Sequence, residues 1–270
     1  MTDQRSSVRL RVLDAGSLEH MDPTRFGLTS DEVQTDRLSV AAYLIEHPRG
    51  RLMWDTGAIA DRDWSPDPAR TPVRASVALP DGSARDLLLV RGIGDQLAEM
   101  GIELSSIDYL ALSHHHFDHT ANVDLFGDAT WLVRRAGYEA MSNPRPPRLT
   151  RPADLAALLS MSRQLIDTEA VDLFGDGTVV LHSAAGHTPG HQVLLVRLAH
   201  TGPVLLCGDL YHYPQERTLD RVPTFESDAA ATRSARRDVE ALIADTGADL
   251  WIGHDAIADA TIRKAPAAYE

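Results

Sequence analysis

The chain has 270 residues, of which 43% are hydrophobic, so it can bury the core of one large domain or two small ones. Its 39 acidic and 26 basic residues give a formal charge of -13, which disfavours nucleic-acid substrates because an acidic surface repels phosphate backbones. With Cys207 as its single cysteine, the sequence excludes an intrachain disulfide and a metal cluster built from several thiolates.

Targeting signals are not recognisable in the sequence. Residues 1–7 are polar and lack the apolar run of a secretory signal, and no stretch approaches the ~20 apolar residues that cross a bilayer. We therefore predict a cytoplasmic protein that has no membrane partner.

The first half of the chain predicts several strands and one short helix. Strands are expected at Val8–Leu13, Ala41–Glu46, Arg51–Trp54, Ile107–Leu112 and Thr130–Arg134, and a helix at Gly94–Met100. The second and third of these strands flank His47-Pro48-Arg49-Gly50, which is typical of a hairpin. Asp14–Leu38 is polar and turn-rich. Ala58–Arg85 is rich in proline and charge, which predicts a long loop that serves either as a functional lid or as a solvated insertion.

The second half predicts a similar group of elements after a Pro- and Arg-rich connector at Asn143–Pro152. Helical spacing occurs at Leu155–Leu165 and Asp228–Ala244, and strands are expected at Thr178–His182, Gln192–Leu198, Val204–Cys207 and Leu250–Ile252. Two groups of strands, each followed by helices, favour an α/β fold in which two packed sheets lie between helices, a four-layer αββα sandwich. We expect a single domain over residues 1–270, because candidate ligands lie on both sides of the connector.

A histidine cluster, His114-His115-His116-Phe117-Asp118-His119, directly follows one of the apolar strands. Residues two apart in an extended segment point the same way, so His114 and His116 can face one metal ion. Asp118 and His119 follow the turn and can reach a second ion. Imidazole and carboxylate ligands suit zinc, and also iron, cobalt or manganese. A histidine run by itself can also be an adventitious metal binder.

Three further candidates occupy equivalent places after other strands. His187, Asp209 and His254 each lie just past an apolar run and directly after a glycine, which allows close backbone approach. The complete set gives each of two metal ions three terminal ligands and one shared carboxylate, with room for a bridging water. His115 is expected to point away from its neighbours, and His191 to brace its loop.

The same residues resemble the metallo-β-lactamase-fold hydrolases, whose pattern is His-x-His-x-Asp-His followed by distant His, Asp and His. The resemblance runs from about Val8 to about Asp255. It implies that the first metal ion is held by His114, His116 and His187, the second by Asp118, His119 and His254, and that Asp209 bridges them. It also implies that Asp55 is a structural aspartate that supports the metal loop. A metal-bridging hydroxide would then attack the substrate, and Asp118 would orient it and carry a proton to the leaving group.

Within that superfamily, the chain is most similar to the N-acyl homoserine lactonases. The similarity lies in Ser113–His119, in Tyr43–Gly50 and in Asp55-Thr56-Gly57. Two positions depart from the lactonase pattern. Thr120-Ala121-Asn122 replaces the usual Ala-Gly, and His212 stands where the lactonases have a substrate-contacting tyrosine. The flanking Tyr211 and Tyr213 are candidate donors to a substrate carbonyl, or aromatic residues packed beneath a loop.

The resemblance predicts a binuclear zinc hydrolase that cleaves a lactone or ester in a small molecule, and it leaves a homodimer open. Organophosphate or aryl-ester hydrolases and glyoxalase II-like thioester hydrolases share the same ligand set and stay open as alternatives. A non-catalytic metal-binding sensor is a further alternative. Cysteine-ligand β-lactamases are disfavoured, because Cys207 lies two residues before Asp209.

Overall fold

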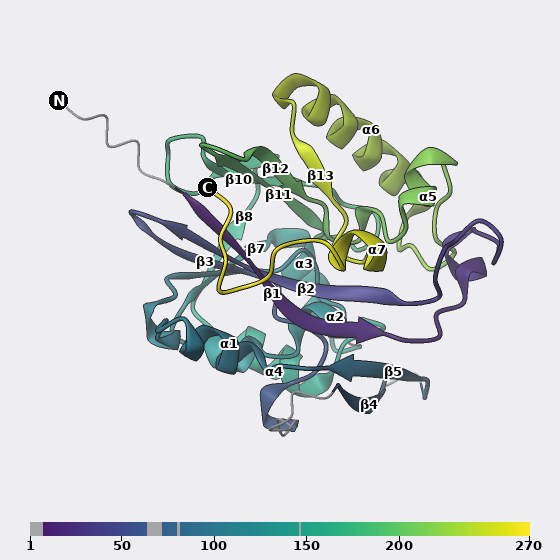
Figure 1. Cartoon of the computed structure of the whole chain (residues 1–270), viewed down its shortest axis with the longest axis horizontal. Helices are drawn as coiled ribbons and strands as arrows, with labels where there is room; N and C mark the ends of the chain where they lie inside the picture. The colour runs from purple at the N-terminus through teal and green to yellow at the C-terminus, as the bar shows by residue number, and fades with distance from the viewer. Residues whose placement is uncertain (1–7, 64–71, 80–81, 146) are drawn as a thin grey trace.

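The computed structural model describes residues 8–63, 72–79, 82–145 and 147–270. In this part of the chain two β-sheets pack face to face, with α1 and α4 outside one sheet and α6 outside the other (Figure 1). The predicted αββα sandwich is therefore confirmed. Among the described residues, no helix combines the length and the apolar character that crossing a bilayer requires.

The first sheet has the strand order β4-β5-β1-β2-β3-β6-β7-β8. Its strands are β1 (Arg9–Leu18), β2 (Leu38–His47), β3 (Gly50–Trp54), β4 (Val73–Ala78), β5 (Ala84–Leu89), β6 (Tyr109–Ala111), β7 (Thr130–Arg134) and β8 (Arg163–Ile166). Strands β3, β6, β7 and β8 run parallel to one another, whereas β4, β5, β1 and β2 pair in antiparallel fashion.

The second sheet has the order β13-β12-β11-β10-β9. Its strands are β9 (Ala170–Asp172), β10 (Val179–Ser183), β11 (Gln192–Leu198), β12 (Gly202–Leu206) and β13 (Asp249–Trp251). The last two are parallel, so their carboxyl ends meet at one edge of the sheet. The α-helices are α1 (Ile93–Glu99), α2 (Phe117–Thr120), α3 (Arg135–Met141), α4 (Pro152–Ser160), α5 (Pro214–Thr218), α6 (Ala229–Thr246) and α7 (Ala256–Asp259).

The main apolar layer lies between the two sheets. Successive side chains of a strand point to opposite faces, so Tyr43 and Ile45 of β2 join Leu194 and Leu206 of the second sheet in this layer. Leu44 of the same strand points the other way and belongs to the apolar cluster that includes α1. Because both faces of β2 are covered, this strand reads in the sequence as a nearly continuous apolar run.

Helix α6 covers the outer face of the second sheet through Ala235 and Val239. The carboxylate of Asp228 caps its first turn by accepting from the backbone N–H groups of Ala230 and Ala231, at 2.9 and 3.0 Å. Gly247 ends the helix with a φ of +67°. The sequence carries both signals, which is why the predicted helix at Asp228–Ala244 agrees closely with the structure.

Two sequence predictions need correction. The segment Ala58–Arg85 is not simply a loop, because β4 and the start of β5 form a hairpin there; its residues 64–71 and 80–81 lie outside the described residues. The helix expected at Leu155–Leu165 ends at Ser160, and Arg163–Ile166 becomes β8 by pairing with β7. In both cases a partner distant in sequence decides the structure, and a local pattern does not contain that partner.

Candidate metal centre

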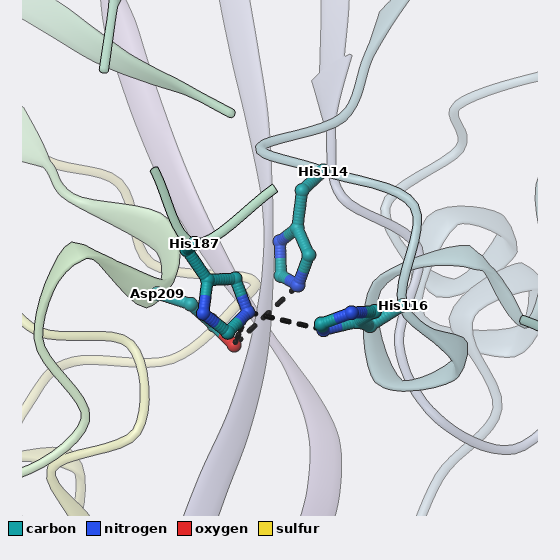
Figure 2. Close-up of side chains that lie close together, drawn as sticks. All are labelled: His114, His116, His187 and Asp209. Atoms are coloured by element: carbon teal, nitrogen blue, oxygen red, sulfur yellow. Dashed lines mark hydrogen bonds and ion pairs between the residues drawn. The ribbon is translucent and has the colours of Figure 1, made fainter. Parts of the chain in front are cut away.

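The seven predicted ligand residues all lie in segments that follow strands, with Asp118 and His119 in the short helix α2, and all are buried. The ligand atoms form two groups, and within each group the atoms lie within 4.8 Å of one another. His114 and His116, which follow β6, meet His187 and Asp209 from the second sheet in the first group, as Figure 2 shows. Asp118, His119 and His254 form the second group. The structure thus brings together the whole set that the sequence singled out.

Asp209 faces both groups at once. Its Oδ2 lies 3.5 Å from Nε2 of His114 and 3.3 Å from Nε2 of His187. Its Oδ1 lies 3.0 Å from Nε2 of His119 and 3.1 Å from Nε2 of His254. The two oxygens of one carboxylate are therefore divided between two sets of imidazole nitrogens, which is the placement that a shared ligand requires.

Three of the imidazole rings are held through their other nitrogen. Such contacts fix the orientation and the tautomer of a ring, and leave its Nε2 directed at the centre. The contacts join Nδ1 of His119 to Oδ2 of Asp55 at 2.9 Å, Nδ1 of His187 to Oε1 of Glu226 at 2.9 Å, and Nδ1 of His254 to the carbonyl oxygen of Ser39 at 2.6 Å.

The atoms that face one another at this centre fit divalent cations. Nε2 of His114, His119 and His254 and Oδ1 of Asp209 are buried, and none has a hydrogen-bond partner among the described residues. A buried polar atom without a partner lowers the stability of the fold. Several such nitrogen and oxygen atoms that face one another are therefore expected to bind a cation. Nitrogen and carboxylate donors are ligands that zinc accepts, and that iron, cobalt and manganese accept as well.

The pKa shifts of three of the ligand residues suit metal binding. Burial lowers the pKa of His114 and of His116 well below the ordinary histidine value, so both rings are neutral and offer a lone pair. Burial disfavours the charged form of Asp209, but nearby His119 and His254 outweigh it and hold the pKa of this carboxyl well below its usual range. Asp209 is therefore an ionised ligand.

Asp55 supports the loop that carries the histidine cluster. Its Oδ1 accepts from the backbone N–H of Ser113 at 2.7 Å, while Oδ2 contacts His119. The residue has a left-handed backbone with a φ of +57°, a conformation that aspartate tolerates better than most residues. Asp55 thus joins the end of β3 to the loop after β6, the structural role that the resemblance implies.

The loop that carries Asp209 approaches the histidine loop very closely. Gly208 has a φ of +51°, and a Cβ atom there would lie 2.5 Å from Cβ of Ser113. His191 connects its own loop to the loop that carries Asp209, because its Nδ1 lies 3.1 Å from the carbonyl oxygen of Ala184 and its Nε2 accepts from the backbone N–H of Asp209 at 3.0 Å. His115 belongs to neither ligand group.

His212 lies at the centre, in the position where the lactonase pattern has a tyrosine. Its Nε2 is 3.2 Å from Oδ2 of Asp209, and its ring is parallel to that of His254 with 5.5 Å between centroids. The carboxylate of buried Glu216 lies 3.3 Å from its Nδ1. The structure therefore keeps His212 among the candidate catalytic residues.

The two neighbouring tyrosines lie elsewhere, which corrects their prediction as substrate contacts. The hydroxyl of Tyr211 donates to Oε1 of Glu240 on α6 at 3.1 Å. Tyr213 packs its ring edge-on against Phe26, with 5.2 Å between centroids. Neither tyrosine lines the pocket at the ligand groups. Successive residues of an extended segment alternate in direction, so placing His212 inward turns both neighbours away.

A pocket and a larger cavity open onto the centre. The inner pocket reaches Asp118, Asp209 and His254. The adjoining outer cavity has a volume of about 760 Å³. The two adjoin each other, because four of their lining residues are shared: Arg25, His116, Leu149 and Phe225.

Comparison with known proteins decides the family. The sequence profile of the Metallo-beta-lactamase superfamily matches residues 35–254. This chain belongs to the metallo-β-lactamase superfamily. Within the superfamily it is 29% identical to the N-acyl homoserine lactonase AttM of Azorhizobium caulinodans, over 100% of both chains.

Solved structures of lactone hydrolases share the fold. An N-acyl homoserine lactone hydrolase with the product N-hexanoyl-L-homoserine at its catalytic metal centre has a TM-score of 0.77 and 21% identity, over 97% of this chain and 99% of that one. AidC, a dizinc quorum-quenching lactonase, has a TM-score of 0.66 and 18% identity, over 93% and 88% of the two chains. The expected family and fold are confirmed, and the predicted hydrolase class agrees with these relatives.

Proposed function

We propose that this protein is a binuclear metal-dependent hydrolase that opens an N-acyl homoserine lactone or a closely related ester. The observation that carries the proposal is Asp209, whose two oxygens face two separate sets of imidazole nitrogens at 3.0–3.5 Å. Similarity to named lactonases over the full length of the chain supports the lactone as the substrate class.

We divide the proposed ligands between two metal ions according to the two groups that their donor atoms form. One divalent cation would be held by His114, His116 and His187, the other by Asp118, His119 and His254, with Asp209 shared. We propose zinc, and iron, cobalt or manganese as substitutes. When bound, two such cations supply a hydroxide nucleophile at neutral pH and polarise the scissile carbonyl.

Two side chains at the inner pocket are placed to act on the substrate. Asp118 lines the pocket with its Oδ2 3.7 Å from Nε2 of His254, and we propose that it orients the attacking water and passes a proton to the leaving alkoxide. His212 lines the same pocket, and its Nε2 can donate a hydrogen bond to a substrate oxygen in place of the lactonase tyrosine.

The walls of the inner pocket suit an acyl chain. Leu18, Phe26, Leu38, Phe117 and Phe225 line it beside the ligand groups. Apolar walls with a few converging polar groups are typical of small-molecule sites. Because the ligands come from both sheets, we also propose that residues 1–270 work as one domain.

The test is hydrolysis of N-hexanoyl-L-homoserine lactone by protein reconstituted with zinc, cobalt or manganese. Proton release and the appearance of the ring-opened acid measure the reaction. A phosphotriester, an aryl ester and a thioester should be assayed in parallel. We expect lactone opening to exceed the other reactions and to be lost in an Asp209→Ala variant. Two tightly bound metal ions without hydrolysis of any of these compounds would favour a metal-binding module and overturn the proposal.

A further inference from the structure

We propose that Glu216 positions His212 for the reaction, and that Arg236 holds Glu216 in place. This inference rests on the proposed hydrolase function, in which Nε2 of His212 donates a hydrogen bond to a substrate oxygen. Glu216 and Arg236 belong to neither ligand group and do not line the inner pocket, so both act on the substrate only through His212.

Glu216 lies against the edge of the His212 ring that is remote from Asp209. It is the third residue of α5 and is fully buried. Its Oε1 accepts from the backbone N–H groups of His212 and Tyr213, at 3.0 and 3.2 Å, and lies 3.3 Å from Nδ1 of the His212 ring. Nε2 of the same ring lies 3.2 Å from Oδ2 of Asp209. One carboxylate oxygen thus contacts both the backbone and the side chain of His212.

Capping of α5 explains only part of this arrangement. A carboxylate at the third position of a helix commonly accepts from the N–H of the residue before the helix, which here is Tyr213. That contact requires neither burial of the carboxylate nor a second contact with the ring of His212. Because a buried carboxylate lowers stability unless it is paired and hydrogen-bonded, the burial of Glu216 calls for partners beyond the helix cap.

Arg236 of α6 is the charged partner of this buried carboxylate. Its Nη2 donates to Oε2 of Glu216 at 2.7 Å, from the helix that lies beside α5 in Figure 1. Its Nε donates to the carbonyl oxygen of Leu210 at 2.9 Å, and its Nη1 donates to the carbonyl oxygen of Arg221. Since Leu210 and Glu216 lie on either side of His212 in the sequence, one guanidinium holds the chain before this residue and after it.

The orientation of the His212 ring depends on the polar groups at its two nitrogens. The rings of Phe26 and Phe225 pack against it, with centroids at 4.8 and 5.6 Å, and do not distinguish its nitrogen from its carbon atoms. The ring torsion of histidine is broad and roughly two-fold, and turning the ring exchanges each nitrogen with a carbon. Among the described residues, Asp209 faces Nε2 and Glu216 faces Nδ1. Because Asp209 is a proposed metal ligand, Glu216 is the group left to select the orientation.

A contribution to stability does not by itself account for the buried pair of Glu216 and Arg236. Replacing such an ion pair by apolar residues of similar volume is often neutral or stabilising. Hydrogen-bond donors near a reacting carbonyl, in contrast, contribute most when their positions are fixed before the reaction. The pair fixes His212 in this way from outside the pocket.

A double-mutant cycle with zinc-loaded protein and N-hexanoyl-L-homoserine lactone tests the inference. We expect Glu216→Gln to lower kcat by about tenfold and to leave KM and zinc content within about twofold of the parent, because a displaced donor loses its interaction with the transition state. In a His212→Phe background the same change should lower kcat by less than about twofold, since no ring nitrogen is left to position. An equal loss of kcat in both backgrounds would show a purely structural role and overturn the inference.

Glu240→Gln is the matched control and should keep kcat within about twofold of the parent, because Glu240 joins α6 to Arg217 of α5 without contacting His212. If Glu216→Gln does not fold, because Arg236 is left buried without its charged partner, Glu216→Gln/Arg236→Gln removes both charges and should show the same dependence on His212. Loss of zinc from the Glu216 variant, or an unchanged kcat in either it or His212→Phe, would also overturn the inference.

Failure of the proposed function would look different, since the parent protein itself would then hydrolyse none of the compounds. In that event crystal structures of zinc-loaded parent and Glu216→Gln proteins still decide whether Glu216 positions the ring. A His212 ring that turns or shifts away from Asp209 in the variant would support the inference, and an unchanged ring would overturn it.

Discussion

Glu226 contacts His187 on the side of the ring that faces away from the metal centre. Its Oε1 lies 2.9 Å from Nδ1 of the ring, whose Nε2 faces Asp209 at 3.3 Å. Because a carboxylate behind an imidazole fixes the tautomer and increases the basicity of the free nitrogen, Glu226 should strengthen metal binding without touching the metal.

We expect Glu226→Gln to weaken binding of one of the two metal ions by about tenfold or more, because the amide supplies a weaker partner for Nδ1. Competition with a chromophoric chelator measures this affinity. Glu240→Gln is a matched control, since Glu240 contacts Tyr211 and Arg217 away from the centre and should leave metal affinity unchanged. Equal affinity in parent and Glu226→Gln protein would show that Glu226 does not support the site.

At the residue scale, the sequence predicts the metal ligands better than it predicts the residues that hold those ligands in place. His187, Asp209 and His254 are recognisable because each follows an apolar run and a glycine. Glu226 and Ser39 are not, because neither lies near a ligand in sequence and neither belongs to a spaced motif. For His212 and its two tyrosine neighbours, the sequence identifies the segment, but only the backbone direction decides which ring faces inward.

At the scale of elements, the centre depends on how closely two loops approach. The loop after β12 meets the loop after β6 at Gly208, where a side chain would collide with Ser113 and would also require an unfavourable left-handed backbone. The glycine therefore serves two purposes at once, a dihedral angle and a short contact.

Gly208→Ala should lower the free energy of unfolding by about 1–3 kcal/mol more than Gly247→Ala does, and should weaken metal binding as Asp209 shifts. Gly247 is the matched control, because it has a similar φ of +67° but nothing within 4 Å of its added Cβ. Urea unfolding and metal titration of both variants give the comparison. Similar losses in the two variants would mean that the close contact is unimportant.

Helices and strands were predictable from the sequence wherever the local pattern of apolar residues agrees with the fold. The strands at Thr130–Arg134 and Gln192–Leu198 have the bounds expected from sequence. Strands β4 and β8 were not predictable, since each exists through pairing with a neighbour, and the segments that form them read locally as loop and helix. Register between distant segments is a property of the packed sheet.

At the scale of the molecule, the two sheets each contribute part of the centre. The first sheet supplies His114, His116, Asp118 and His119 through the segment after β6, and the second supplies His187, Asp209 and His254. Arginines also line the two pockets at the centre, although the molecule as a whole has a net charge of -13. Residue spacing predicts the ligands, but the arginine grouping emerges only when distant segments fold together.

The central claim is that two metal ions share Asp209, and anomalous diffraction from crystals of the zinc-loaded protein tests it most directly. We predict two anomalous peaks, one among His114, His116 and His187 and the other among Asp118, His119 and His254, with an Asp209 oxygen bound to each. A single peak, or two peaks without Asp209 between them, would contradict the account.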